Sequence, residues 1–142
     1  QAGQTDGALE VLKDSLAFFE GELERHFRHE ELALFPALAR VIGRAGPVGA
    51  MLAEHESIWN AVDRLAASVE EIEDSKEILG PRAAQHAAQA ASLIVFLLRG
   101  HIQREDTMLF PLAESTLDVA AKHEVDLNIE IVNGEQSRTS VA

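Results

Sequence analysis

The sequence predicts an all-α protein, an antiparallel up-down bundle of long helices. Three long stretches carry apolar residues at helical spacing, strand patterns are missing across the same stretches, and short connections join them. The chain has 142 residues, of which 46% are hydrophobic and 25% charged, as is ordinary for one globular domain. We therefore expect a helical bundle over residues 5–117 and a C-terminal tail or linker over residues 118–142.

The first predicted helix covers residues 9–42. Asp6 has a side chain suited to an N-cap, and Gly43 and Pro47 lie where the helical pattern stops. Eight apolar residues repeat at helical spacing and form the stripe that faces the core: Leu12, Leu16, Phe19, Leu23, Phe27, Leu34, Leu38 and Val41.

Two further helices are predicted over residues 48–72 and 82–117, joined by a connection over residues 73–81. The apolar face of the second helix consists of Val48, Leu52, Trp59, Val62 and Ala66. The stripe of the third helix consists of Ile94, Leu98, Ile102, Leu109 and Leu112.

The last segment, residues 119–142, has a different pattern. Apolar and polar residues alternate over residues 127–132, as in a strand, and Asn133-Gly134 is a turn signal. A lone strand would have no partner in a helical bundle, so we interpret this segment as a tail or linker.

Composition excludes several functions. Without cysteine, the chain has no disulfide, thiolate ligand or cysteine nucleophile. Its 24 acidic and 12 basic residues, a net charge of −12, argue against nucleic acid and anionic membranes as partners. The longest strongly apolar run, residues 93–98, is too short to span a bilayer, and no signal peptide is visible. We expect a cytoplasmic location.

The first and third helices share a repeated motif. The pattern H-x-x-x-E-[ED]-x-x-L-F-P begins at His26 and again at His101, 75 residues later. Such repeats are typical of duplicated units that pack against each other, and a duplicated pair of helices makes a four-helix bundle.

Five polar residues lie inside the apolar stripes when the helices are drawn at about 100° per residue: His26, Glu30, His55, His101 and Glu105. Buried carboxylates are costly without a partner, and these stripes hold no Lys or Arg. The two glutamates therefore need a cation. Imidazole and carboxylate together suit Fe, Mn or Zn, and two glutamates on facing helices can bridge two ions.

Other interpretations stay open. A single His/Glu pair at i,i+4 is usually a surface contact, and a single core histidine is usually satisfied by hydrogen bonds. Asp106 is an alternative carboxylate ligand, while His29 is suited to an outer-shell role beside Glu30. His86 is too far from the others along its helix to join them. We place Phe35 and Phe110 on the side opposite the ligands.

With these motifs in this order, the chain resembles the hemerythrin-like, or HHE cation-binding, domain family. The carriers are H-F-x-x-E-E-x-x-L-F-P at residues 26–36, L-x-E-H-x-x-I at 52–58 and H-I-x-x-E-D-x-x-L-F-P at 101–111, within a resemblance that spans residues 5–117. The resemblance implies a four-helix bundle with two non-heme iron ions. It also implies the metal ligands, with both glutamates bridging: His26, Glu30, His55, His101 and Glu105.

The chain departs from the family in two ways. Trp59 stands where the oxygen carriers have a second histidine, which weakens the case for plain oxygen carriage and leaves a coordination position open. The family's first helix, which carries a histidine, has no counterpart ahead of residue 9. It could lie upstream of Gln1, the tail could supply it through His123, or a second copy could complete the bundle in a homodimer.

We therefore expect a domain that binds or senses O2, NO or iron, with a small diatomic gas or peroxide as the partner of the metal site. The alternative is a di-iron enzyme that consumes peroxide or NO or assists iron–sulfur cluster repair. No Ser/His/Asp arrangement or phosphate-binding loop is present, and no catalytic residue is assigned. A metal-free interaction bundle is the third interpretation.

Overall fold

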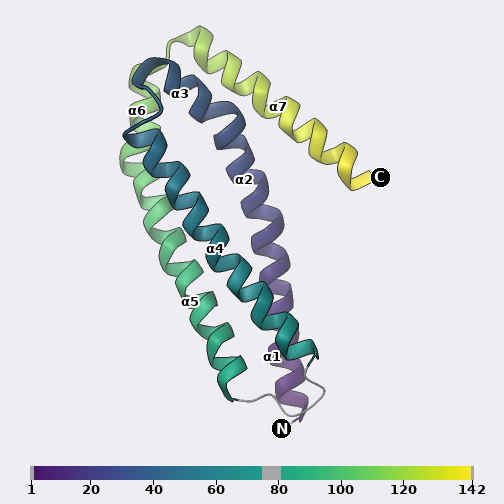
Figure 1. Ribbon diagram of the computed structural model, residues 1–142. Coiled ribbons are helices and arrows are strands. Elements are labelled where there is room, and N and C mark those ends of the chain that lie inside the picture. The colour runs from purple at the N-terminus through teal and green to yellow at the C-terminus, as the bar shows by residue number, and fades with distance from the viewer. Residues whose placement is uncertain (1, 75–80, 142) are drawn as a thin grey trace. The chain divides into compact units, whose positions relative to one another are not determined.

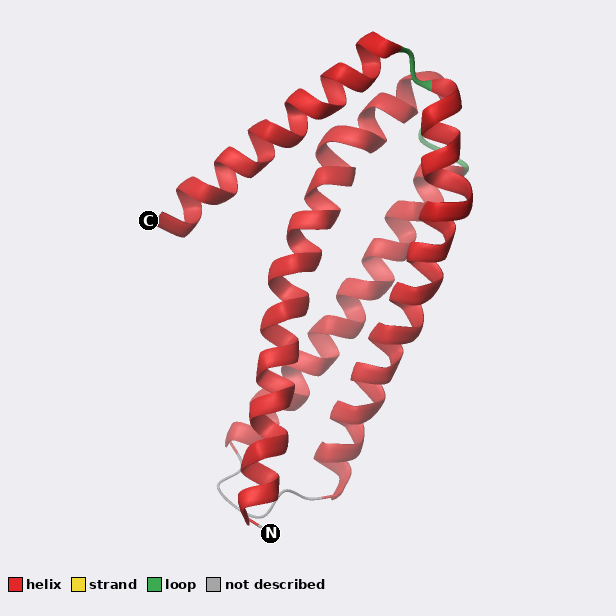
Figure 2. Ribbon diagram, turned by 180° about the vertical axis from the view of Figure 1, so that it is seen from behind, coloured by secondary structure: helices red, strands yellow, loops and turns green. Residues whose placement is uncertain are grey.

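A computed structural model describes residues 2–74 and 81–141 of the chain, and helices account for nearly all of them (Figure 1). No strand occurs within these ranges (Figure 2), which confirms the all-α class. The first helical run contains α1 (Ala2–Phe18), η1 (Phe19–Leu23), α2 (Glu24–His29), η2 (Glu30–Leu34) and α3 (Phe35–Ile42). It is followed by α4 (Pro47–Asp74), α5 (Pro81–Arg104), η3 (Glu105–Leu109), α6 (Phe110–Thr116) and α7 (Val119–Val141).

The helix ends agree with the turn residues of the sequence. After α3, Gly43 and Gly46 adopt φ values of 85° and 71°, a region that favours glycine. Pro47 is the first residue of α4, where its missing N–H costs nothing. The N-cap predicted at Asp6 is wrong, because α1 begins at Ala2. Most of the predicted connection, residues 75–80, lies outside the described residues.

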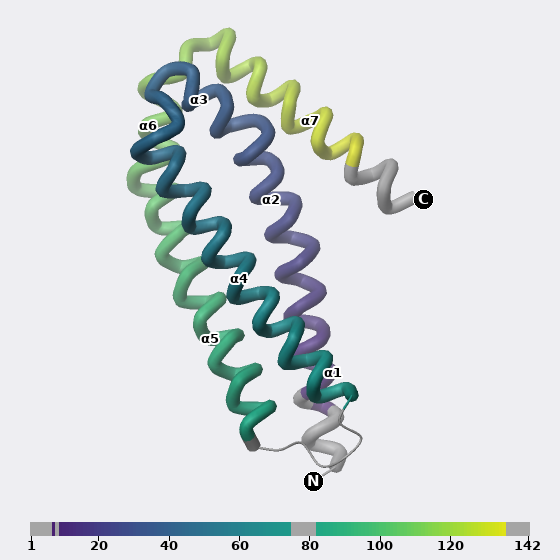
Figure 3. The backbone as a smooth tube through the Cα atoms, viewed as in Figure 1, coloured from purple at the N-terminus to yellow at the C-terminus, as the bar shows by residue number. Residues whose placement is uncertain are grey.

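The strand pattern predicted for the tail is also wrong, because α7 is a helix (Figure 3). The apolar residues of this segment also repeat at helical spacing, and the burial of its side chains follows the helical period. Val132 is buried, and Val125 and Ile129 are partly buried, whereas Ile131 is exposed. Asp118 caps the helix, since its Oδ1 accepts a hydrogen bond from the Ala121 N–H at 2.8 Å.

The chain divides into two compact units. The first comprises residues 1–22 and 56–100, and the second residues 23–55 and 101–142. In the first unit, Lys13 on α1 pairs with Glu73 on α4 at 2.7 Å. All five predicted metal ligands belong to the second unit.

The second unit has its own apolar core, to which α7 contributes. The buried members of this core are Phe35, Ala37, Leu38, Val48, Met51, Leu109, Ala113 and Leu117. Ala121 and Val125 of α7 pack against it, and α7 also contacts α2 and η2. Polar contacts add to this packing: His29 Nε2 lies 2.7 Å from Asn133 Oδ1, and Arg28 pairs with Glu135 at 3.2 Å. The tail is therefore an integral helix of this unit.

Within the described ranges, no helix combines the length and apolar character that crossing a membrane requires.

Replacing Val132 by Ala tests the packing of α7. We expect the variant to lower the free energy of unfolding by about 1–3 kcal/mol, because it removes buried methyl groups. The matched control is Ile131→Ala on the exposed face, with an expected change within about 0.5 kcal/mol. Urea denaturation measures both, and equal effects would contradict the packing of α7.

Candidate metal centre

A π turn begins at each glutamate of the repeated motif. In η2 the Phe35 N–H donates to the Glu30 carbonyl, and in η3 the Phe110 N–H donates to the Glu105 carbonyl, five residues back in each case. Pro36 follows the first of these turns and has no N–H to continue the ordinary helical ladder. The wider turn accommodates the proline, so the repeated Leu-Phe-Pro sets the backbone where each glutamate projects.

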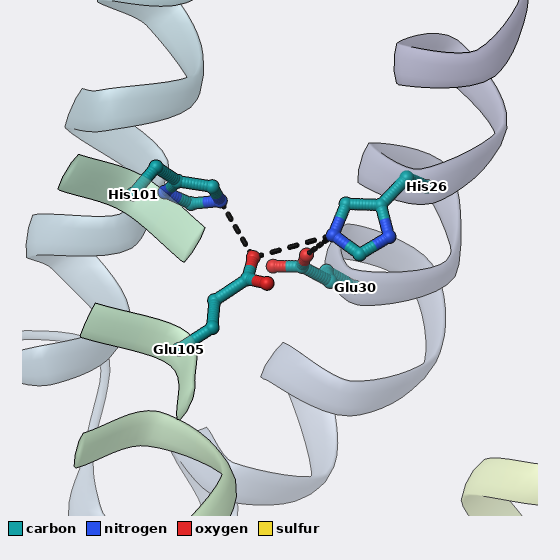
Figure 4. Close-up of side chains that lie close together, drawn as sticks. All are labelled: His26, Glu30, His101 and Glu105. Carbon is teal, nitrogen blue, oxygen red and sulfur yellow. Dashed lines mark hydrogen bonds and ion pairs between the residues drawn. The ribbon is translucent and has the colours of Figure 1, made fainter. Parts of the chain in front are cut away.

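The two His/Glu pairs of the repeat meet in the second unit (Figure 4). One ligand atom from each of His26, Glu30, His101 and Glu105 lies within 4.8 Å of the others. His26 Nε2 is 2.5 Å from Glu30 Oε1 and 3.3 Å from Glu105 Oε1. His101 Nε2 is 2.6 Å from Glu105 Oε1. Segments 75 residues apart in the sequence thus form one cluster.

The fifth predicted ligand, His55 on α4, adjoins this cluster. Its Nε2 lies 3.2 Å from His101 Nε2 and 3.4 Å from Glu30 Oε2. The structure therefore brings together all five residues that the sequence analysis singled out.

Four of the five residues are buried, and one is not. Exposed fractions are 4% for Glu30, 2% for His55, 0% for His101 and 2% for Glu105. The His26 side chain is 45% exposed. The helical pattern placed His26 inside the apolar stripe, so this part of the prediction is wrong. The cluster has an open edge at His26.

Close contacts between imidazoles and carboxylates shift the pKa values of the cluster. Close contact with Glu105, and then with Glu30, raises the pKa of His26 to about 10. Burial lowers the pKa of His101, but contacts with Glu105 and Glu54 outweigh burial and raise it overall. Burial likewise favours the neutral form of Glu105, yet the two histidines hold its pKa well below its ordinary value. The glutamates thus favour positive charge beside them.

Glu30 provides the test of whether a metal fits. Its Oε1 pairs with His26 Nε2 and its Oε2 lies 3.4 Å from His55 Nε2, but among the described residues neither contact has the geometry of a hydrogen bond. A buried carboxylate left in this way is costly, and a bound cation would satisfy both oxygens. Imidazole nitrogens and carboxylate oxygens are ligands that Fe, Mn and Zn accept. The residues that would hold the metal are His26, Glu30, His55, His101 and Glu105.

Aromatic rings cover the buried side of the cluster. Phe27 stacks on His55, with ring centroids 3.7 Å apart and an interplanar angle of 8°. Phe35 lies 5.5 Å from His55 between ring centroids, so its predicted place opposite the ligands is wrong. Helical spacing gives a residue's direction on its own helix, but it does not reveal which neighbouring helix the residue meets.

The other candidate residues lie apart from the cluster. His29 pairs with Asn133 of α7, and Asp106 is exposed. His86 is an exposed residue of the first unit. His123, the histidine through which the tail could supply a ligand, is exposed on α7.

The sequence analysis assigned no role to two carboxylates that lie behind the buried histidines. Glu54 Oε1 is 2.9 Å from His101 Nδ1, and Glu31 Oε2 is 3.5 Å from His55 Nδ1. In the sequence, the one feature that could have pointed to Glu54 is its position directly before His55 in the second motif.

The fold and the cluster define an all-α domain of the metal-binding class. A sequence model of the hemerythrin HHE cation-binding domain matches residues 1–113, and the chain belongs to this family. The hemerythrin-like fold expected from the three motifs is thereby confirmed. No curated protein and no solved structure matches the chain.

Removing the His26 imidazole tests the electrostatics of the metal-free cluster. The pKa of His26 is about 10 in the folded chain against an ordinary 6.5, so its ion pairs stabilise the fold fully below pH of about 6.5. This stabilisation is lost as the pH rises towards about 10. We expect metal-free His26→Gln to lose less stability than the unsubstituted chain between pH of about 7 and 10, as measured by urea denaturation. His123→Gln is the control and should follow the unsubstituted chain, whereas a parallel curve for His26→Gln would contradict the account.

Proposed function

We propose that this domain holds non-heme iron in a dinuclear centre and uses it to bind or sense O2 or NO, or to hold iron itself. The observation that carries the proposal is a buried pair of carboxylates, Glu30 and Glu105, among three imidazoles. Neither oxygen of Glu30 has a hydrogen-bond partner among the described side chains.

Iron is the metal that best fits the ligand set together with the family. Mixed nitrogen and oxygen donors without thiolate match a non-heme iron site. The glutamates of two helical segments can bridge a pair of ions, as in other carboxylate bundles. Bound iron would supply redox chemistry and affinity for a diatomic molecule. Manganese and zinc are the competing outcomes of the test.

The chain's own residues set what can approach the site. Phe27, stacked on His55, and Phe35 beside it give the buried side an apolar wall that excludes water. The His26 side chain, 45% exposed, is the part of the cluster that solvent reaches. A small neutral gas suits an apolar wall better than a charged substrate, because a charged group would lose its hydration there.

The half-exposed His26 also favours a second candidate, an enzyme that consumes peroxide or NO or assists iron–sulfur cluster repair. Rapid exchange of substrate and product needs an open edge of this kind. The two candidates differ in turnover. A sensing or storage domain changes its visible spectrum reversibly with gas or redox state, whereas an enzyme consumes many equivalents of peroxide or NO per metal centre.

Metal content tests the proposal directly. We expect protein purified without added metal, or reloaded with ferrous iron, to contain about two irons per chain by elemental analysis. Glu30→Gln keeps the shape of the side chain but removes the charge that the cation would neutralise. It should therefore lose most of the iron.

The matched control is Glu56→Gln, which removes the same charge from an exposed side chain next to His55 in the sequence. We expect it to keep its iron. Equal iron content in the unsubstituted chain and in Glu30→Gln would show that Glu30 is not a ligand. Absence of iron from the reloaded, unsubstituted chain would overturn the iron assignment.

A further inference from the structure

We propose that Glu54, itself held by Arg104, is a positioning residue that fixes the ring of His101 so that its Nε2 faces the metal. The inference rests on the proposed function in so far as it needs a metal at the cluster. The hydrogen bonds that carry it belong to the chain alone.

The contacts of His101 show how Glu54 can position its ring. Its Nδ1 donates to Glu54 Oε1 at 2.9 Å, across from α5 to α4. Its Nε2, on the opposite side of the ring, points to Glu105 Oε1 at 2.6 Å and to His55 Nε2 at 3.2 Å. The ring is fully buried, with 0% exposure. Nδ1 of His101 is therefore hydrogen-bonded to Glu54, whereas Nε2 faces the cluster.

A metal needs a ring nitrogen without a proton, and the hydrogen bond at the other nitrogen decides which one that is. With its proton on Nδ1 and directed to Glu54, His101 offers the Nε2 lone pair to the cluster. A carboxylate in this place also makes the imidazole a stronger donor to a metal.

Arg104 holds the carboxylate in place. Its Nε donates to Glu54 Oε2 at 2.6 Å, so each oxygen of Glu54 has its own partner. These two hydrogen bonds hold the carboxylate oriented toward His101.

The second buried histidine lacks an equivalent contact. Glu31 Oε2 is 3.5 Å from His55 Nδ1, and that nitrogen has no hydrogen-bond partner among the described groups. His55 is held instead by stacking on Phe27. Of the two buried imidazoles, His101 is thus the one whose orientation depends on a carboxylate.

Ferrous iron affinity, measured anaerobically on the full chain by competition with a chromophoric chelator, tests the proposal. We expect Glu54→Gln to weaken binding about 10- to 100-fold. The matched control is Glu56→Gln, an exposed position on the other side of His55 that loses the same charge. It should change the affinity less than about threefold. Equal losses in the two variants would overturn the proposal.

Arg104→Gln separates positioning from direct ligation, because among the described residues the Arg104 guanidinium contacts Glu54 and none of the five cluster residues. We expect a loss of about two- to fivefold, as for an exposed ion pair. Adding Arg104→Gln to Glu54→Gln should cost nothing further, since both act through the same hydrogen bond. If the double variant lost affinity by the product of the two single losses, Arg104 would not act through Glu54.

Imidazole proton NMR of the metal-free chain keeps this inference distinct from the proposed function. We expect an exchange-protected Nδ1–H resonance of His101 that disappears in Glu54→Ala, which has no acceptor at this place, and persists in Glu56→Ala. Circular dichroism establishes that the variants remain helical. If the unsubstituted chain binds no iron, the proposed function is wrong. The Nδ1–H resonance still shows whether His101 donates to Glu54. A resonance unchanged by Glu54→Ala would overturn the positioning role.

Discussion

The site depends on two buried carboxylates, which need positive charge beside them. Glu30 and Glu105 are almost fully buried, and an uncompensated buried charge costs several kcal/mol. In the metal-free chain, His26 and His101 lie within ion-pair distance of Glu105, and these contacts raise the pKa values of both histidines. A metal ion would supply positive charge directly to the oxygens of Glu30, whose contacts in the metal-free chain lack hydrogen-bond geometry.

Two π turns in the backbone position the buried glutamates. The π turns at Glu30–Leu34 and Glu105–Leu109 start at the two glutamates and end just before Phe-Pro, so the proline that breaks the ordinary ladder also marks the site. Glu54 and Phe27 then hold the two buried histidines, one by a hydrogen bond and the other by stacking. The helix α7 completes the second unit with contacts to α2 and η2.

Periodicity and the internal repeat were sufficient to predict the three long helical stretches before Asp118 and the five clustered residues, because a His/Glu pair inside an apolar stripe is visible within one helix. What the sequence could not disclose depends on neighbouring segments. The exposure of His26 is set by what does and does not cover it, and the stacking of Phe27 on His55 joins different helices. The segment after Asp118 satisfies both strand and helix periods, and the core of the second unit selects the helix.

The central claim is that Glu30 and Glu105 share a bound metal. Anomalous diffraction at the iron edge, from crystals of the iron-loaded chain, tests it most directly. The account predicts anomalous peaks within bonding distance of both carboxylates and of His101 Nε2. A peak elsewhere on the surface, or both glutamates hydrogen-bonded to protein groups in a crystal whose iron lies outside the cluster, would contradict it.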